Sequence, residues 1–151
     1  MTQELNKAKN YAFLLLKFRP RSINEIETRL KEKGYTHQAV KETLDFLKEK
    51  KFLDDDYFAK GWIEWRLKKP FGFRRIRQEL QLKGVGQEIV ESNIDSLKEN
   101  YSEEKIVRLL AAERMKRLKT IEPKKAKSRI FSWLLRRGFS QGTVIDAVRE
   151  L

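Results

Sequence analysis

Arginine and lysine side chains are the residues of this chain whose number and spacing best suit a chemical role. The segment Lys105–Arg137 contains 12 Lys or Arg against two Glu, a net charge of +10, and Arg66–Lys83 contains seven against one Glu, a net charge of +6. Cations at this density neutralise phosphates, and the release of counterions then drives binding to nucleic acids. The sequence therefore predicts contact with a polyanion through these two segments.

The basic side chains gather around two proline-containing stretches. Lys68 and Lys69 directly precede Pro70, and Lys124 directly follows Pro123. A surface that binds along a groove needs positive charge repeated in this way. The predicted polyanion-binding residues are Arg66, Lys68, Lys69, Arg74, Arg75, Arg77, Lys116, Arg117, Lys119, Lys124, Lys125, Lys127, Arg129, Arg136 and Arg137.

Aromatic residues are interleaved with these cations. They are Trp62, Trp65, Phe71, Phe73 and Trp133. Stacking on nucleobases is one interpretation, since every base has a π-face. Packing between helices is the other, and the spacing favours it, because Trp62 and Trp65 lie three residues apart, as neighbours on one helix face do.

No set of residues matches a familiar catalytic or metal-binding pattern. Asp54, Asp55 and Asp56 lack the Gly-containing loop that shapes a calcium site, so we expect one of them to cap a helix. His37 stands alone, and no phosphate-loop, dinucleotide-binding, zinc-protease or nucleophile-elbow motif occurs. Without cysteine there is neither a thiol nucleophile nor a disulfide. We predict a protein that is not an enzyme and that needs no cofactor and no metal.

The composition narrows the remaining classes. The net charge is +12 and the pI about 9.9, with 40% hydrophobic and 37% charged residues. That apolar share buries a core but leaves much surface, as is typical of thin units. The apolar run Tyr11–Leu16 is too short for a membrane span or a signal peptide. We therefore expect a soluble cytoplasmic protein without membrane contact.

An internal repeat defines the elements that must position these side chains. Ile23–Leu47, Phe73–Leu97 and Lys127–Leu151 are each 25 residues long and align without a gap. A repeated small unit favours an extended binding surface over a catalytic pocket. The shared columns are Ile26, Ile76 and Ile130; Leu30, Leu80 and Leu134; Gly34, Gly84 and Gly138; Val40, Val90 and Val144; and Leu47, Leu97 and Leu151.

Each repeated stretch has the pattern of two helices joined by a glycine turn. Glycine suits the left-handed position that ends a helix, and the residue two positions later, Thr36, Gly86 or Ser140, suits the N-cap of the next. Ser22 with Glu25 matches a capping box. A further helix is predicted before each pair, near residues 7–18, 56–68 and 102–118.

These elements predict an all-α fold of three tandem three-helix repeats that form an elongated, curved array. Each repeat comprises a helix, a Pro-containing bend, a helix, a glycine turn and a helix. The predicted repeats span residues 1–52, 53–100 and 101–151. The two helices and glycine turn of a repeat also resemble a DNA-binding helix-turn-helix. Acidic residues on the second helices, such as Glu88, Glu91 and Asp146, argue against base reading in the major groove by all three repeats.

Four strings, in this order and spacing, resemble the RecX family of regulatory proteins. The resemblance covers roughly residues 8–151, and the second repeat departs from it by carrying Gly72 where the first has Ser22. The strings are Arg21-Ser22 with Glu25-Ile26 and Leu30-x-x-x-Gly34; Leu47-x(4)-Phe52-Leu53-Asp54-Asp55 with Tyr57-x-Ala59; Gly72-x-x-x-Ile76-x-x-Glu79-Leu80-x-x-Lys83-Gly84-Val85; and Trp133-Leu134-Leu135-Arg136-Arg137-Gly138-Phe139-Ser140.

The resemblance implies a bacterial cytoplasmic regulator of the RecA recombinase. Family members bind the RecA–DNA filament in its helical groove and limit strand exchange, ATP hydrolysis and repressor cleavage. The implied partners are the RecA filament and DNA, either single-stranded or double-stranded. We expect the protein itself to be a monomer. The implied setting is DNA repair, recombination and the SOS response. Two alternatives stay open: an autonomous DNA-binding repeat protein, and a non-catalytic or RNA-associated scaffold.

Overall fold

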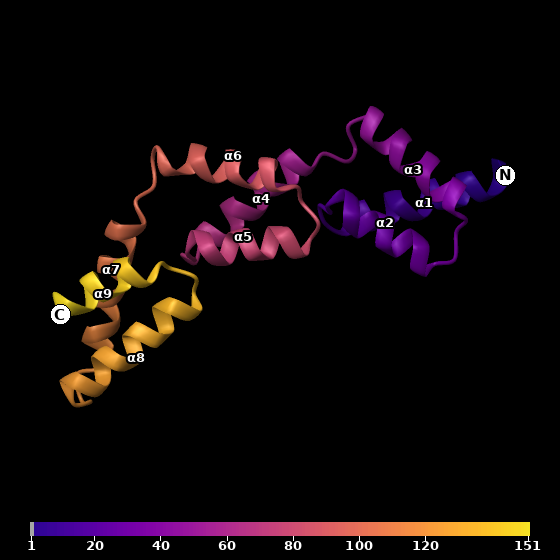
Figure 1. The fold of residues 1–151 in the computed structure, drawn as a ribbon. Coiled ribbons are helices and arrows are strands. Elements are labelled where there is room, and N and C mark those ends of the chain that lie inside the picture. The colour runs from indigo at the N-terminus through magenta and orange to yellow at the C-terminus, as the bar shows by residue number, and fades with distance from the viewer. Residues whose placement is uncertain (1) are drawn as a thin grey trace. The chain divides into compact units, whose positions relative to one another are not determined.

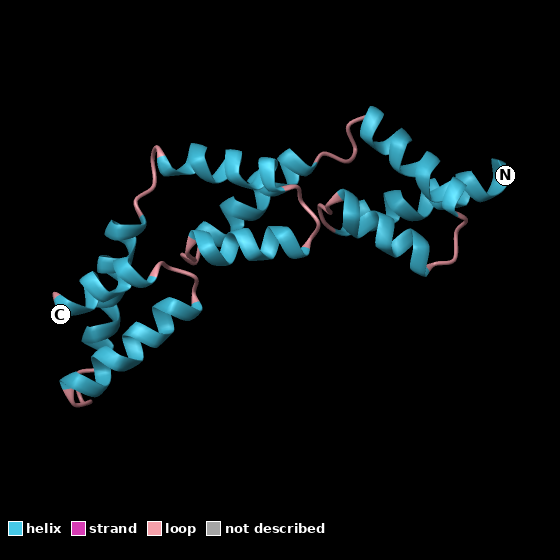
Figure 2. Ribbon diagram, viewed as in Figure 1, coloured by secondary structure: helices cyan, strands magenta, loops and turns pink. Residues whose placement is uncertain are grey.

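The computed structural model describes residues 2–151, except for the side chain of Thr2, and Figure 1 shows the course of the chain. Within this range the chain forms nine helices and no strand, as Figure 2 shows, so the predicted all-α fold is confirmed. The first helix begins at Thr2 rather than near residue 7. The helices are α1 (Thr2–Phe18), α2 (Ile23–Glu32), α3 (His37–Glu49), α4 (Asp55–Leu67), α5 (Phe73–Leu82), α6 (Gln87–Lys98), α7 (Glu103–Arg117), α8 (Pro123–Arg136) and α9 (Gln141–Arg149).

The chain divides into two compact units. The first unit comprises the residues up to Trp62 together with Leu80–Asn93, and the second comprises Ile63–Glu79 together with Ile94–Leu151. Helices α4, α5 and α6 therefore contribute residues to both units. The predicted repeat boundaries are not tested by this division and stay a prediction.

In the first unit, α1, α2 and α3 surround one core, and each of these helices contacts the other two. Apolar side chains three or four residues apart lie on one face of a helix, and each helix turns such a face inward. The core residues are Ala8, Ala12 and Leu15 on α1; Ile26 and Leu30 on α2; Val40, Leu44 and Leu47 on α3; and Leu53 beyond it.

The second unit repeats this arrangement with α7, α8 and α9, which also contact one another pairwise. Its core contains residues from the same repeat columns as the first core, which confirms the alignment of the first and third repeated stretches. The core residues are Val107 and Ala111 on α7; Ile130 and Leu134 on α8; Phe139 in the turn; and Val144 and Ala147 on α9.

The three shared glycines close the same turn. Gly34, Gly84 and Gly138 have φ values of 96°, 79° and 89°, in the left-handed region that a side chain penalises. In each turn two successive N–H groups donate to carbonyls of the last helical turn, as in a Schellman motif. The bonds are Gly34 N to Lys31 O and Tyr35 N to Leu30 O; Gly84 N to Gln81 O and Val85 N to Leu80 O; and Gly138 N to Leu135 O and Phe139 N to Leu134 O.

Short polar side chains begin the helices where the sequence predicts them. The Ser22 hydroxyl accepts from Glu25 N at 3.1 Å, and the Glu25 carboxylate accepts from Ser22 N at 3.0 Å, so the capping box is present. The Thr36 hydroxyl caps α3 by accepting from Ala39 N. The predicted capping role of the aspartates belongs to Asp54, whose Oδ1 accepts from the backbone N–H groups of Asp56 and Tyr57 in the first turn of α4.

The first unit also contains a contact between the start of α2 and the turn that follows α5, which we name the first junction. The Ser22 hydroxyl donates to the carbonyl of Lys83 at 2.6 Å, and the Lys83 ammonium lies 3.2 Å from the Glu25 carboxylate. A Cβ atom added at Gly84 would lie 2.6 Å from Cγ of Asn24. Gly84 therefore closes its turn, and its lack of a side chain also allows the start of α2 to pack against this turn.

Two carboxylates that accept hydrogen bonds from the start of α2 have pKa values shifted in opposite directions. Burial alone would raise the pKa of Glu25, but hydrogen bonds from Arg19, the Ser22 backbone and Lys83 outweigh it and lower the pKa to about 2. Burial raises the pKa of Asp55, although its Oδ1 accepts from Ile23 N at 2.9 Å. The charge of Glu25 is thus stabilised by the fold, whereas that of Asp55 is not.

Candidate polyanion-binding surface

The second unit contains a second junction, in which the bend before α5 contacts the C-terminal end of α8. The Gly72 N–H donates to the carbonyl of Arg137 at 2.7 Å, and the Arg137 guanidinium donates to the carbonyl of Pro70 at 2.9 Å. A side chain at Gly72 would collide with the backbone of Gly138. This close approach explains why the second repeat carries glycine where the first carries Ser22.

Besides Arg137, two more of the predicted anion-binding arginines take part in this second junction. Arg74 donates to the carbonyl of Leu135 at 2.7 Å, and Arg75 donates to the carbonyl of Arg136 at 3.0 Å. The last carbonyls of a helix lack partners within it, and positive charge near this end is favourable. These guanidiniums therefore help to hold α5 against α8.

Phe71 lies at the centre of the same second junction. The guanidinium carbons of Arg66, Arg75 and Arg137 lie 4.6, 4.7 and 4.8 Å from the centre of its ring. Arg66 also forms a two-pronged ion pair with Glu79. Burial, followed by the positive charges of Arg114 and Arg75, lowers the pKa of Arg137. Ring and carboxylate together offset the repulsion within this group of cations.

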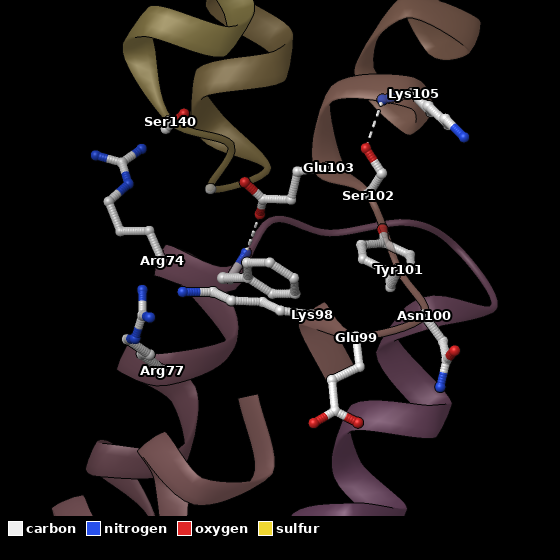
Figure 3. Close-up of a pocket in the computed structure, with 12 residues that line it drawn as sticks. Arg74, Arg77, Lys98, Glu99, Asn100, Tyr101, Ser102, Glu103, Lys105 and Ser140 are labelled. Carbon is white, nitrogen blue, oxygen red and sulfur yellow. Dashed lines mark hydrogen bonds between the residues drawn. The ribbon is translucent and has the colours of Figure 1, made fainter. Parts of the chain in front are cut away.

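A cleft of about 860 Å³ opens beside the second junction, and Figure 3 shows its lining. Arg74, Arg77 and Lys98 carry their nitrogen atoms on one side of this view, with Lys105 away from them. The sequence prediction includes the two arginines of this set but misses both lysines. The other lining residues are Phe73, Glu99, Asn100, Tyr101, Ser102, Glu103, Gly138 and Ser140.

Two of the residues that line this cleft, Tyr101 and Glu103, are partly shielded from solvent and have raised pKa values. The Glu103 carboxylate accepts from Phe73 N at 2.5 Å, and burial raises its pKa. Burial likewise raises the pKa of Tyr101 to about 12, and within residues 2–151 its hydroxyl has no hydrogen-bond partner. Glu103 begins α7 as Asp55 begins α4, and each accepts from the first N–H of a neighbouring helix. A carboxylate at the start of one helix thus accepts from the first N–H of another helix beside each of the two junctions.

The remaining predicted cations are distributed over the surface of the second unit. Lys68 and Lys69 are exposed and follow the end of α4. Of the predicted residues on α8, Arg129 and Arg136 line a smaller cleft against α7. The others on α7, α8 and their connection are exposed, apart from the half-buried Lys127; they are Lys116, Arg117, Lys119, Lys124, Lys125 and Lys127.

The five aromatic residues interleaved with the basic segments differ in exposure. Phe73 is buried and its ring lies 5.6 Å from that of Tyr101, as the core-packing interpretation expects. Trp65, by contrast, is 53% exposed. Trp62, Phe71 and Trp133 are half-buried, and each has a cation over its ring. Core packing therefore accounts for Phe73 but not for Trp65.

The sequence signals for the missed residues are weak. Lys98 ends α6 and Lys105 lies in the first turn of α7, on either side of a short connection. The tertiary structure places both of them, with Arg77, in the lining of one cleft. Sequence reasoning that counts charge within a segment has no means of pairing residues across a turn.

Comparisons with known proteins give a consistent result. Family models for the first and the second three-helix domain of RecX match residues 8–47 and 54–92. The chain is 32% identical over 149 residues to a "Regulatory protein RecX" of Clostridium botulinum, covering 90% of this chain and 69% of that protein. It is 31% identical over 147 residues to a "Regulatory protein RecX" of Chlorobium limicola, covering 97% and 90%.

A solved structure has the same fold. The crystal structure of RecX from Lactobacillus salivarius superimposes with a TM-score of 0.83 at 20% sequence identity, covering 100% of this chain and 98% of that one. Among the helices described here, none combines the length and apolar character that crossing a membrane requires. On the matched domain models and the extent of these identities, the chain belongs to the RecX family.

Proposed function

We propose that this protein regulates a RecA recombinase by binding the RecA–DNA filament, and that it inhibits the recombinase, ATPase and co-protease activities of that filament. Membership of the RecX family supports a regulatory role. The partner and the direction of the effect are those that the sequence resemblance implies. The protein acts through binding alone and supplies no catalytic residue.

The observation that carries the proposal is the unpaired positive charge on α7, α8 and their connection. Some exposed cations of the first unit are paired with carboxylates: Lys31 with Glu27 at 2.8 Å and Lys60 with Asp56 at 2.7 Å. Among residues 2–151, by contrast, no ion pair is formed by Lys116, Arg117, Lys119, Lys124, Lys125, Lys127, Arg129 or Arg136.

Uncompensated charge of one sign makes a polyanion the natural ligand of this surface. Mutual repulsion among the cations weakens when phosphates bind between them and release their counterions. A nucleoprotein filament presents such phosphates beside protein surface. We therefore assign filament contact mainly to the second unit, with the predicted residues Lys68, Lys69 and Arg77 adding to it.

The proposal is tested by titrating the protein into a RecA reaction that hydrolyses ATP on single-stranded DNA. We expect the ATPase rate to fall at protein concentrations well below those that coat the same DNA without RecA. The double variant Lys124→Glu/Lys125→Glu should require a higher concentration for the same inhibition. The double variant Lys7→Glu/Lys41→Glu changes the net charge equally, at exposed positions of the first unit, and should behave like the wild type.

Two results would contradict the proposal. Inhibition that appears only when the protein coats the DNA would favour an autonomous DNA-binding protein. A protein that leaves the ATPase rate unchanged at every concentration would favour a scaffold without regulatory effect.

A further inference from the structure

A second, smaller cleft lies between α7 and α8 and measures about 370 Å³. Arg114 of α7 and Leu118, the residue that directly follows this helix, form one wall. Residues of α8 at helical spacing form the other wall, with no carboxylate among them. They are Ser128, Arg129, Ser132, Trp133 and Arg136.

Trp133 fixes the position of the positive charge on the α7 side of this cleft. The guanidinium carbon of Arg114 lies 4.5 Å from the centre of the Trp133 ring, and that of Arg137 lies 4.9 Å from it. When a guanidinium lies over an indole ring, the contact holds the guanidinium in place and leaves its N–H donors available to a ligand. Arg114 is thus oriented before any ligand arrives.

Three arginines line this cleft, and no carboxylate is among its lining residues. Within the described part of the chain, Arg114, Arg129 and Arg136 form no ion pair, whereas the nearby Arg108 pairs with Glu104 at 2.8 Å. Guanidinium groups present planar pairs of donors that match the oxygens of phosphate. Ser128 and Ser132 add hydroxyl donors of the kind that often contact nucleic-acid backbones.

We propose that the α7–α8 cleft binds a phosphate group of a nucleic-acid backbone. Phosphate suits the site better than the carboxylate of an acidic peptide, because a docked peptide would also need apolar contacts and only Leu118 and Trp133 supply them. The inference rests on the proposed function and deepens it, since it identifies where the second unit contacts DNA. Arg114, Ser128, Ser132 and Trp133 thereby join the predicted residues Arg129 and Arg136.

The test compares Arg129→Gln in the cleft with Arg149→Gln at the exposed end of α9, two variants with the same change of charge. Binding of the full-length protein to a fluorescein-labelled oligothymidylate is followed by anisotropy over a series of salt concentrations. We expect Arg129→Gln to weaken binding and to reduce the slope of log affinity against log salt by about one, as the loss of one phosphate contact does. Arg149→Gln should leave that slope at the wild-type value.

Three outcomes would overturn the inference. The first is a salt slope for Arg129→Gln equal to that of the wild type. The second is an equal loss of oligothymidylate affinity in Arg129→Gln and Arg149→Gln. The third is that Arg129→Gln weakens the binding of polyglutamate but leaves the binding of oligothymidylate unchanged. The ATPase titration separates this site from the proposed function. A wild type that binds DNA through Arg129 but leaves the RecA ATPase unchanged refutes the function and keeps the site. A wild type that inhibits the ATPase while Arg129→Gln binds oligothymidylate normally refutes the site and keeps the function.

Discussion

Replacing Gly138 with alanine tests whether the second junction stabilises the fold, and Gly34 provides a matched control in the same chain. Both glycines end a helix with positive φ, 89° and 96°. A Cβ atom at Gly34 would meet nothing within 4 Å, whereas one at Gly138 would lie 2.5 Å from the backbone nitrogen of Arg75 and 2.9 Å from its Cα. The two substitutions therefore share the same backbone strain and differ in the contact.

The difference in the free energy of unfolding follows from these two terms. An alanine in the left-handed region is destabilising by about 1–2 kcal/mol, which is the whole effect expected for Gly34→Ala. Overpacking adds about 1–3 kcal/mol at Gly138, because the atoms in the way are the Cβ and the backbone N and Cα of Arg75 and not a flexible side-chain end. The expected loss for Gly138→Ala is thus roughly 2–5 kcal/mol.

Urea unfolding of the full-length protein, followed by far-UV circular dichroism, measures both losses. We expect Gly138→Ala to lower the unfolding midpoint by about 1.5 to 4 times as much as Gly34→Ala, since the slope of the transition stays the same when only stability changes. Equal shifts for the two variants would refute the reasoning, because they would mean that the contact between Gly138 and Arg75 contributes nothing beyond the turn.

Two further predictions concern the first unit. Glu25→Gln should lower stability at pH 7 by up to about 3 kcal/mol, because the pKa of Glu25 falls from 4.5 to about 2 on folding and one pKa unit corresponds to about 1.4 kcal/mol. A folded-state pKa below the unfolded value gives stability that is present above pH 4.5 and is lost as the pH falls toward 2. The urea midpoints of the wild type and of Glu25→Gln should therefore converge as the pH falls from 4.5 toward 2. A difference between the two midpoints that persists at pH 2 would show that the charge of Glu25 is not the source of the stability. Leu80→Ala should lose about 2–5 kcal/mol, since Leu80 is 0% exposed, and a loss below about 0.5 kcal/mol, typical of surface sites, would contradict its place in the repeat.

Local patterns in the sequence predicted most of the fold. The turn glycines, the capping box at Ser22 and the Thr36 cap are confirmed, because each depends on hydrogen bonds within a few residues along the chain. The apolar columns are confirmed as core positions for the same reason, apart from the half-buried Leu97 and Leu151, since helical periodicity alone fixes the buried face. The basic segments were likewise visible as charge counts, and their role as a polyanion surface stays a prediction.

The tertiary structure decided how the basic residues are used. Arg74 and Arg75 donate to carbonyls at the end of α8, and Arg137 donates to Pro70 O, so cations that look alike in the sequence differ in their partners. It also explained Gly72 and identified the α7–α8 cleft around Arg114. The physical reason is that a helix-forming pattern specifies which face of a helix is buried but not which neighbouring helix end meets it. Contacts between residues more than 60 positions apart arise only when the repeats pack together.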